Sequence, residues 1–141
     1  MQKFEWMESL SVGVPTIDAQ HRELIAAFND LSNAIEQGNG AAAVKKLMIS
    51  LQYLIEWYLE HEENCADKHA CAIAERHRQG QVQLSKMLKN LQAQYCASGA
   101  SDEIARSAHA RLADWLVSSV MIIDASVAPC VLKSATPVAV S

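Results

Sequence analysis

Apolar residues recur every three or four positions along most of this chain, which is the period of an α-helix with one buried face. The first such stripe consists of Ile17, His21, Leu24, Phe28, Leu31 and Ile35. Pro15 disfavours helical geometry in the residue before it, and Thr16 is suited to cap the helix start. Gly38-Asn39-Gly40 is a strong stop signal. The pattern predicts a helix over residues 17–37.

Three further stretches have the same period, and they predict helices over about residues 41–65, 73–96 and 102–128. Ser101 is a good N-cap for the last of these helices. The two acidic residues that follow it suit the positive end of the helix dipole. Pro129 closes that helix. Gly80 interrupts the third helix, which indicates that a bulky group or a backbone packs closely there.

Four helices of about 20 residues joined by short links predict an all-α fold, namely an up-down-up-down antiparallel four-helix bundle. Residues 1 to about 16 have no helical pattern and are expected to form an irregular N-terminal arm. We expect the bundle domain to span residues 1–133 and residues 134–141 to form a short, flexible tail. The segment 66–72 is expected to be a short or partly helical link.

Composition supports this class and excludes several partners. Half of the 141 residues are apolar, few are aromatic, and there are only five glycines and three prolines, which favours helices over a β-sandwich or barrel. The formal net charge is −4 and no basic cluster is present, so we expect no nucleic-acid partner. No apolar run approaches the ~20 residues that span a bilayer. The N-terminal residues lack an apolar signal core, so we expect a cytoplasmic location.

The four cysteines do not suggest a disulfide framework. Their spacing is irregular: they are Cys65, Cys71, Cys96 and Cys130. In a reducing compartment they are expected to be free thiols, of which at most one or two are metal ligands.

Polar residues interrupt the apolar stripes at one end of the predicted bundle. His21, His61 and His77 lie on the stripes of the first three helices, and Asp124 lies near the core edge of the fourth. Counting along antiparallel helices places all four at the same end. Cys65 lies four residues after His61 and therefore on the same helix face.

Four buried, unpaired polar groups would be costly, at ~1–3 kcal/mol each against a typical total stability of ~5–15 kcal/mol. Hydrogen bonds from histidine to aspartate could satisfy them, but a metal ion would satisfy them more completely, and we favour the metal. His69 is expected in the link between helices and His109 on the exposed side of the fourth helix. Glu62 is mainly a solvated charge, although it could accept a hydrogen bond from a ligand imidazole.

The start and end of the chain carry more specific motifs. They are Trp6, Val12-Gly13-Val14, Ile17-Asp18-Ala19-Gln20-His21, Asp114-Trp115-Leu116 and Asp124. On these residues the chain resembles the hemerythrin family, in particular the bacterial hemerythrins, over almost its whole length. The resemblance implies a four-helix bundle around a non-haem di-iron centre that reversibly binds dioxygen.

The resemblance also implies that several ligands of the family are replaced in this chain. His21 and Asp124 stand at ligand positions of the family. His77 also does so if the alignment with the family inserts one residue before it. A terminal histidine of the family is replaced by Trp57 and the bridging glutamate by His61. Two further histidines are replaced by Gln81 and Ser119. Two metal ions would then lack donors, whereas one ion would have three imidazoles and one carboxylate, a set suited to zinc or iron, with Cys65 as a possible extra ligand.

These residues favour a non-catalytic module with one non-haem metal ion, acting as a sensor or ligand-binding domain for a small diatomic or redox ligand. A regulatory protein partner would fit that role. The first alternative is a di-iron dioxygen-binding protein. A further alternative is an enzyme, but the sequence shows no dedicated acid–base pair outside the metal ligands to support it. A haem-binding bundle, with haem in space opened by Gly80 and Ser119, and a metal-free interaction domain are the remaining alternatives.

Overall fold

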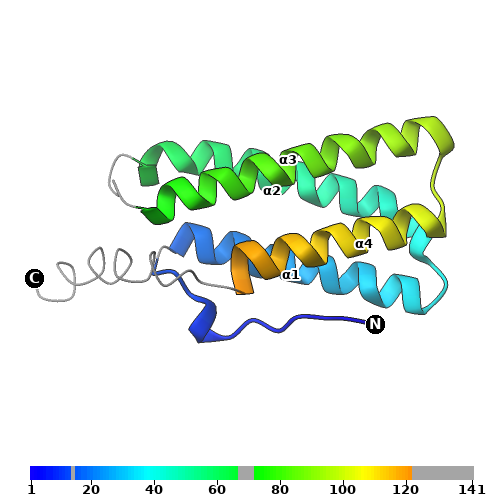
Figure 1. The fold of residues 1–141 in the computed structure, drawn as a ribbon, viewed down its shortest axis with the longest axis horizontal. Helices are drawn as coiled ribbons and strands as arrows, with labels where there is room; N and C mark the ends of the chain where they lie inside the picture. Colours follow the sequence, from blue (N-terminus) through cyan, green and yellow to red (C-terminus); the bar gives the residue numbers. More distant parts are fainter. Residues whose placement is uncertain (14, 67–71, 122–141) are drawn as a thin grey trace, which may run out of the picture.

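The computed structural model describes residues 1–13, 15–66 and 72–121, excluding the side chains of residues 61–66 and 72–74. Four long helices account for most of this part of the chain: α1 (Pro15–Glu36), α2 (Gly40–Ala66), α3 (Ala72–Ser98) and α4 (Asp102–Leu116). Figure 1 shows that each helix runs opposite to the one before it, with α1 beside α4 and α2 beside α3. The predicted all-α, antiparallel four-helix bundle is confirmed. The proposed domain end at residue 133 and the tail 134–141 lie outside the described residues and stay predictions.

The start of α1 differs from the prediction. The helix begins at Pro15, so Thr16 lies inside the first turn and is not the cap. Proline suits the first helical position, because its φ is already helical and its missing N–H would have no partner there.

The stop at Gly38 and the cap at Ser101 act as expected, whereas Pro129 lies outside the described residues. Gly38 has a φ of 77°, and the Asn39 N–H donates to the Ala34 carbonyl at 2.7 Å, which closes the end of α1. The Ser101 hydroxyl accepts a hydrogen bond from the Ile104 N–H at 3.1 Å and so caps α4.

The end of α4 was not predicted. After Leu116 the chain forms a π-helical turn, η2 (Val117–Met121), in place of the continuous α-helix that the pattern indicated. A π-helical turn contains more residues per turn than the α-helix, so the 3.6-residue period fails at this point. The rest of the predicted helix lies outside the described residues.

An irregular arm precedes α1, as predicted, and it runs along α1 in Figure 1. It contains one 3₁₀ turn, η1 (Glu8–Leu10). Asn29 holds its start, since the side chain accepts from the Phe4 N–H at 2.9 Å and donates to the Phe4 carbonyl at 2.6 Å. Asp18 holds its end, because its carboxylate accepts from the Val12 N–H at 2.9 Å and from the Ser11 hydroxyl at 2.5 Å. These hydrogen bonds hold the arm against α1 near both of its ends.

The core is built from the predicted stripes. Its fully buried side chains include Leu24, Phe28, Leu51, Leu84, Leu112 and Leu116. No helix within the described ranges is long and apolar enough to cross a membrane.

Candidate metal centre

Two of the predicted ligands meet inside the bundle. His21 lies in the second turn of α1 and is 2% exposed, and His77 lies in the second turn of α3 and is 7% exposed. Their ring centroids are 5.2 Å apart with the ring planes inclined at 57°. The structure therefore brings together imidazoles from two helices that are separated in the sequence by the whole of α2.

Three nitrogen atoms of these rings have no hydrogen-bond partner in the part of the chain that the structure describes. They are Nδ1 and Nε2 of His21 and Nε2 of His77. A buried polar atom left without a partner costs about 1–3 kcal/mol. The Tyr58 ring contacts His77 edge-on, with centroids 4.4 Å apart, so an aromatic surface covers one side of that imidazole. A metal ion that bound one nitrogen of each ring would satisfy two of these three atoms.

Both imidazoles are in the form that binds metal. Burial lowers the pKa of His21 to about 4, against an opposing effect of the Asp18 carboxylate. Burial and, to a smaller extent, the neighbouring His21 together lower the pKa of His77 to about 3. Neutral imidazole is the ligating species, so both side chains are ready to donate a lone pair at pH 7.

A pair of side-chain amides lies beside the histidines, one residue before His21 and four residues after His77. The amides of Gln20 and Gln81 bond reciprocally, each Nε2 donating to the other's Oε1 at 3.0 Å. Gln20 also donates to the Leu54 carbonyl at 3.1 Å, which ties α1 and α3 to α2. Both glutamines are almost fully buried. The sequence interpretation treated Gln81 as the replacement of a family ligand and as a possible substitute donor of a di-iron site, and it missed this pairing, although Gln81 continues the apolar stripe of His77.

The other candidate ligands are not placed by the structure. His61 and Cys65 belong to α2, but their side chains lie outside those described, and Asp124 lies outside the described residues altogether. Figure 1 shows that α2 ends at the same end of the bundle as the starts of α1 and α3. Among the described residues no group of three or more His, Cys, Asp or Glu side chains is arranged to hold a metal ion. The assignment of His61, Asp124 and Cys65 therefore stays a prediction.

The expectation that His109 is exposed is wrong. It is 8% exposed, its Nε2 lies 2.7 Å from the Ser32 hydroxyl, and its ring stacks on Phe28 with centroids 4.4 Å apart. The Ser32 hydroxyl also donates to the Gln2 carbonyl of the arm at 2.8 Å. The arm packs against this region and helps to bury His109, and packing against the arm cannot be read from the period of α4.

The bulky neighbour predicted at Gly80 is Trp115, although a Cβ atom would fit there at ordinary contact distances. A Cβ atom there would meet the Ser119 hydroxyl at 3.5 Å and the Trp115 ring at 3.6 Å, and the Trp115 indole N–H donates to the Gly80 carbonyl at 2.8 Å. Trp115 and Ser119 thus occupy the space that the haem alternative required, and this part of the structure gives that alternative no support.

An antiparallel four-helix bundle with facing, buried imidazoles at one end has the architecture in which helical bundles build metal and ligand sites from side chains of facing helices. The chain belongs to the hemerythrin family: residues 12–131 match the family model described as the hemerythrin HHE cation-binding domain. Comparison with curated proteins and with solved structures found no significant match. The family assignment implies that the domain binds a cation, and the unpartnered nitrogens of His21 and His77 fit that role.

Proposed function

We propose that this chain is a non-catalytic module that binds one non-haem metal ion, iron or zinc, and acts as a sensor or ligand-binding domain. His21 and His77 would hold the ion, His61 and Asp124 would complete its coordination, and Cys65 is a candidate extra ligand. When bound, the ion would supply an open coordination position for a small diatomic or redox ligand.

The observation that carries the proposal is the facing pair of buried imidazoles, His21 and His77, with three unpartnered nitrogens. If these rings only filled the core, each would be expected to use a hydrogen-bond partner, as His109 uses Ser32. Their lowered pKa values also support ligation, because the rings need not lose a proton before they bind an ion.

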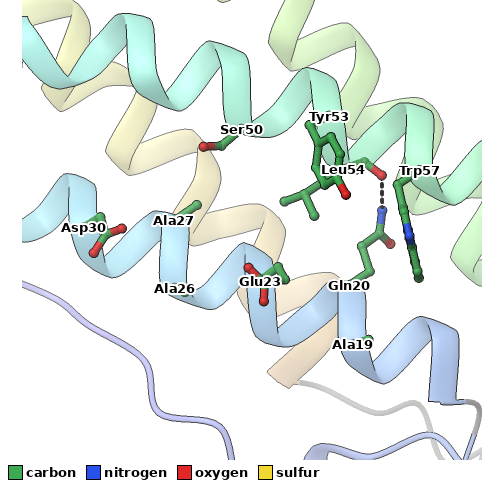
Figure 2. Close-up of a pocket in the computed structure, with 10 residues that line it drawn as sticks. All are labelled: Ala19, Gln20, Glu23, Ala26, Ala27, Asp30, Ser50, Tyr53, Leu54 and Trp57. Carbon is green, nitrogen blue, oxygen red and sulfur yellow. Dashed lines mark hydrogen bonds between the residues drawn. The ribbon is translucent and has the colours of Figure 1, made fainter.

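The amide pair favours one ion over two. A di-iron site of the family type would need a donor at Gln81, but both atoms of that amide are engaged with Gln20. Trp57, at another ligand position of the family, lies against Gln20 in a surface groove (Figure 2). The dioxygen-carrying di-iron alternative therefore has less support than a single-ion module.

The metal content of the purified full chain tests the proposal. We expect about one iron or zinc per chain, and a loss of most of it in His21→Ala and in His77→Ala, because each variant removes a nitrogen donor. His109→Gln is the matched control: it replaces a buried histidine whose Nε2 is already partnered, so its metal content should equal that of the original chain.

Two results would contradict the proposal. About two irons per chain would support the di-iron alternative. Unchanged metal content in both alanine variants, with the fold verified by circular dichroism, would show that the ion binds elsewhere.

A further inference from the structure

A groove runs along the surface between α1 and α2, outside the histidine pair. Its volume is about 480 Å³. Residues of α1 line one side, residues of α2 the other, and Gln20 and Trp57 close one end (Figure 2). Ala19, Ala26 and Ala27 lie on the α1 side, and such small side chains let an occupant approach the helix backbone closely.

The groove is acidic. Glu23 and Asp30 line it and are exposed, and neither makes a hydrogen bond or ion pair with any residue that the structure describes. They are seven residues apart on α1, which is two helical turns or about 10.5 Å along the axis. No lysine or arginine lines the groove. Two carboxylates with regular spacing are therefore available to cationic groups of an occupant.

The α2 side of the groove presents exposed apolar surface. Tyr53 is 64% exposed, and in Figure 2 its ring lies over the space between the two helices. Ile49, one turn before Tyr53, is 61% exposed, and Trp57 follows one turn after it. Residues four apart share a helix face, so these three side chains form one apolar stripe that extends beyond the groove. A stripe of this kind is typical of surfaces that bind a helix.

A second copy of the chain is a poor occupant. Two grooves facing each other would bring Glu23 and Asp30 of both copies together, and like charges in an interface are unfavourable. A small cation would meet the carboxylates but would leave Ile49 uncovered.

We propose that the groove binds a basic amphipathic helix of a partner protein. Two lysines or arginines seven residues apart would meet Glu23 and Asp30, and apolar residues between them would pack on Tyr53. This proposal does not depend on the metal site.

A direct test uses the full chain and a helical peptide of about five turns, roughly 18 residues. The peptide has lysines at a seven-residue spacing and leucines three and four residues after the first lysine. Two controls are the same peptide with glutamate in place of lysine and a long aliphatic diamine. Binding is measured by calorimetry and mapped by amide chemical shifts. We expect only the basic peptide to bind, with shifts at Ala27, Ser50 and Tyr53, and with weaker binding at high salt.

Matched variants locate the site. Glu23→Gln combined with Asp30→Asn should weaken binding about five- to ten-fold, because two charge pairs are lost. Glu5→Gln combined with Glu103→Gln changes the net charge equally at exposed positions away from the groove and should leave binding unchanged. Tyr53→Ala should weaken binding several-fold, whereas Val82→Ala removes an exposed apolar side chain from α3 and should not.

Several results would overturn the proposal. These are no binding of the basic peptide at millimolar concentration, equal binding of the acidic peptide, or equal loss in the two double variants. Diamine binding as tight as that of the peptide would instead assign the groove to a small cation. A dimer of the unliganded chain with protected groove amides would assign it to a second copy.

Discussion

The burial of individual residues in and near the candidate metal centre could be predicted from the sequence to different extents. His21 and His77 are polar residues at apolar stripe positions, so periodicity alone predicted that both are buried at one end of the bundle. Gln20 and Gln81 gave a weaker signal, because a neutral amide is equally common on a solvated face. His109 gave a misleading one, since its burial depends on Phe28, Ser32 and the arm. Residues buried by neighbouring helices were predictable, and residues buried by the irregular arm were not.

The pKa values of His21 and His77 predict how the metal-free domain responds to acid. Each pKa is near 6.5 in the unfolded chain and lower in the folded one, at about 4 and about 3. Below pH 6.5 the unfolded chain therefore binds protons that the folded chain does not. We expect the free energy of unfolding to fall as the pH drops from about 6.5 towards 3, as measured by urea unfolding in the presence of a chelator.

His77→Gln is the comparison variant for this acid response. It removes one titrating imidazole, so its unfolding free energy should fall less steeply between pH 6.5 and pH 4 than that of the original chain. Parallel pH profiles for the two proteins would contradict the burial and neutrality of His77. Carboxylate titration affects both proteins equally and cancels in the difference.

At the scale of the helices, the sequence predicted ends that have a local signal better than it predicted a change of helix type. Gly38 and Ser101 end and begin helices where the sequence indicated, because a left-handed glycine and a serine cap act through their nearest neighbours. The π-helical turn at 117–121 had no such local signal. Its position next to Trp115, whose indole is anchored to Gly80 of α3, indicates that tertiary packing contributes to it.

Gly38 provides a test of the α1 end. Its φ of 77° lies in the left-handed region, where a Cβ atom costs roughly 1–2 kcal/mol. No atom lies within 4 Å of where a Cβ would stand, so this cost is purely conformational. Gly38→Ala should lower the unfolding free energy by that amount, and Gly38→Asn by less, because asparagine tolerates this conformation. Equal stability of all three proteins in thermal unfolding would show that the turn relaxes.

At the scale of the whole molecule, the arm acts as a fifth element of the bundle. Its Phe4 packs on Phe28, with ring centroids 5.1 Å apart. Its Gln2 carbonyl accepts a hydrogen bond from the Ser32 hydroxyl, which also contacts His109. The sequence correctly indicated that the arm is irregular. It did not indicate where the arm lies, because its hydrogen bonds to Asn29 and Asp18 join residues without a shared period.

Asn29→Ala tests how the arm is held. The variant leaves the N–H and the carbonyl of Phe4 without their partner, so amide hydrogen exchange at Phe4 should become faster. Exchange at Leu51, in the middle of α2, should stay slow because the helical core is unchanged. Unchanged exchange at Phe4 would show that aromatic packing alone fixes the arm, and faster exchange at both sites would indicate global destabilisation.

The reciprocal amide pair has a consequence for how this sequence can evolve. If histidine replaced Gln81 alone, the buried amide oxygen of Gln20 would lose the N–H that it accepts, while Nε2 would keep the Leu54 carbonyl. A buried amide oxygen without a donor costs about 1–3 kcal/mol. A histidine at position 81 would therefore cost less when Gln20 is replaced at the same time by a residue that needs no donor from α3.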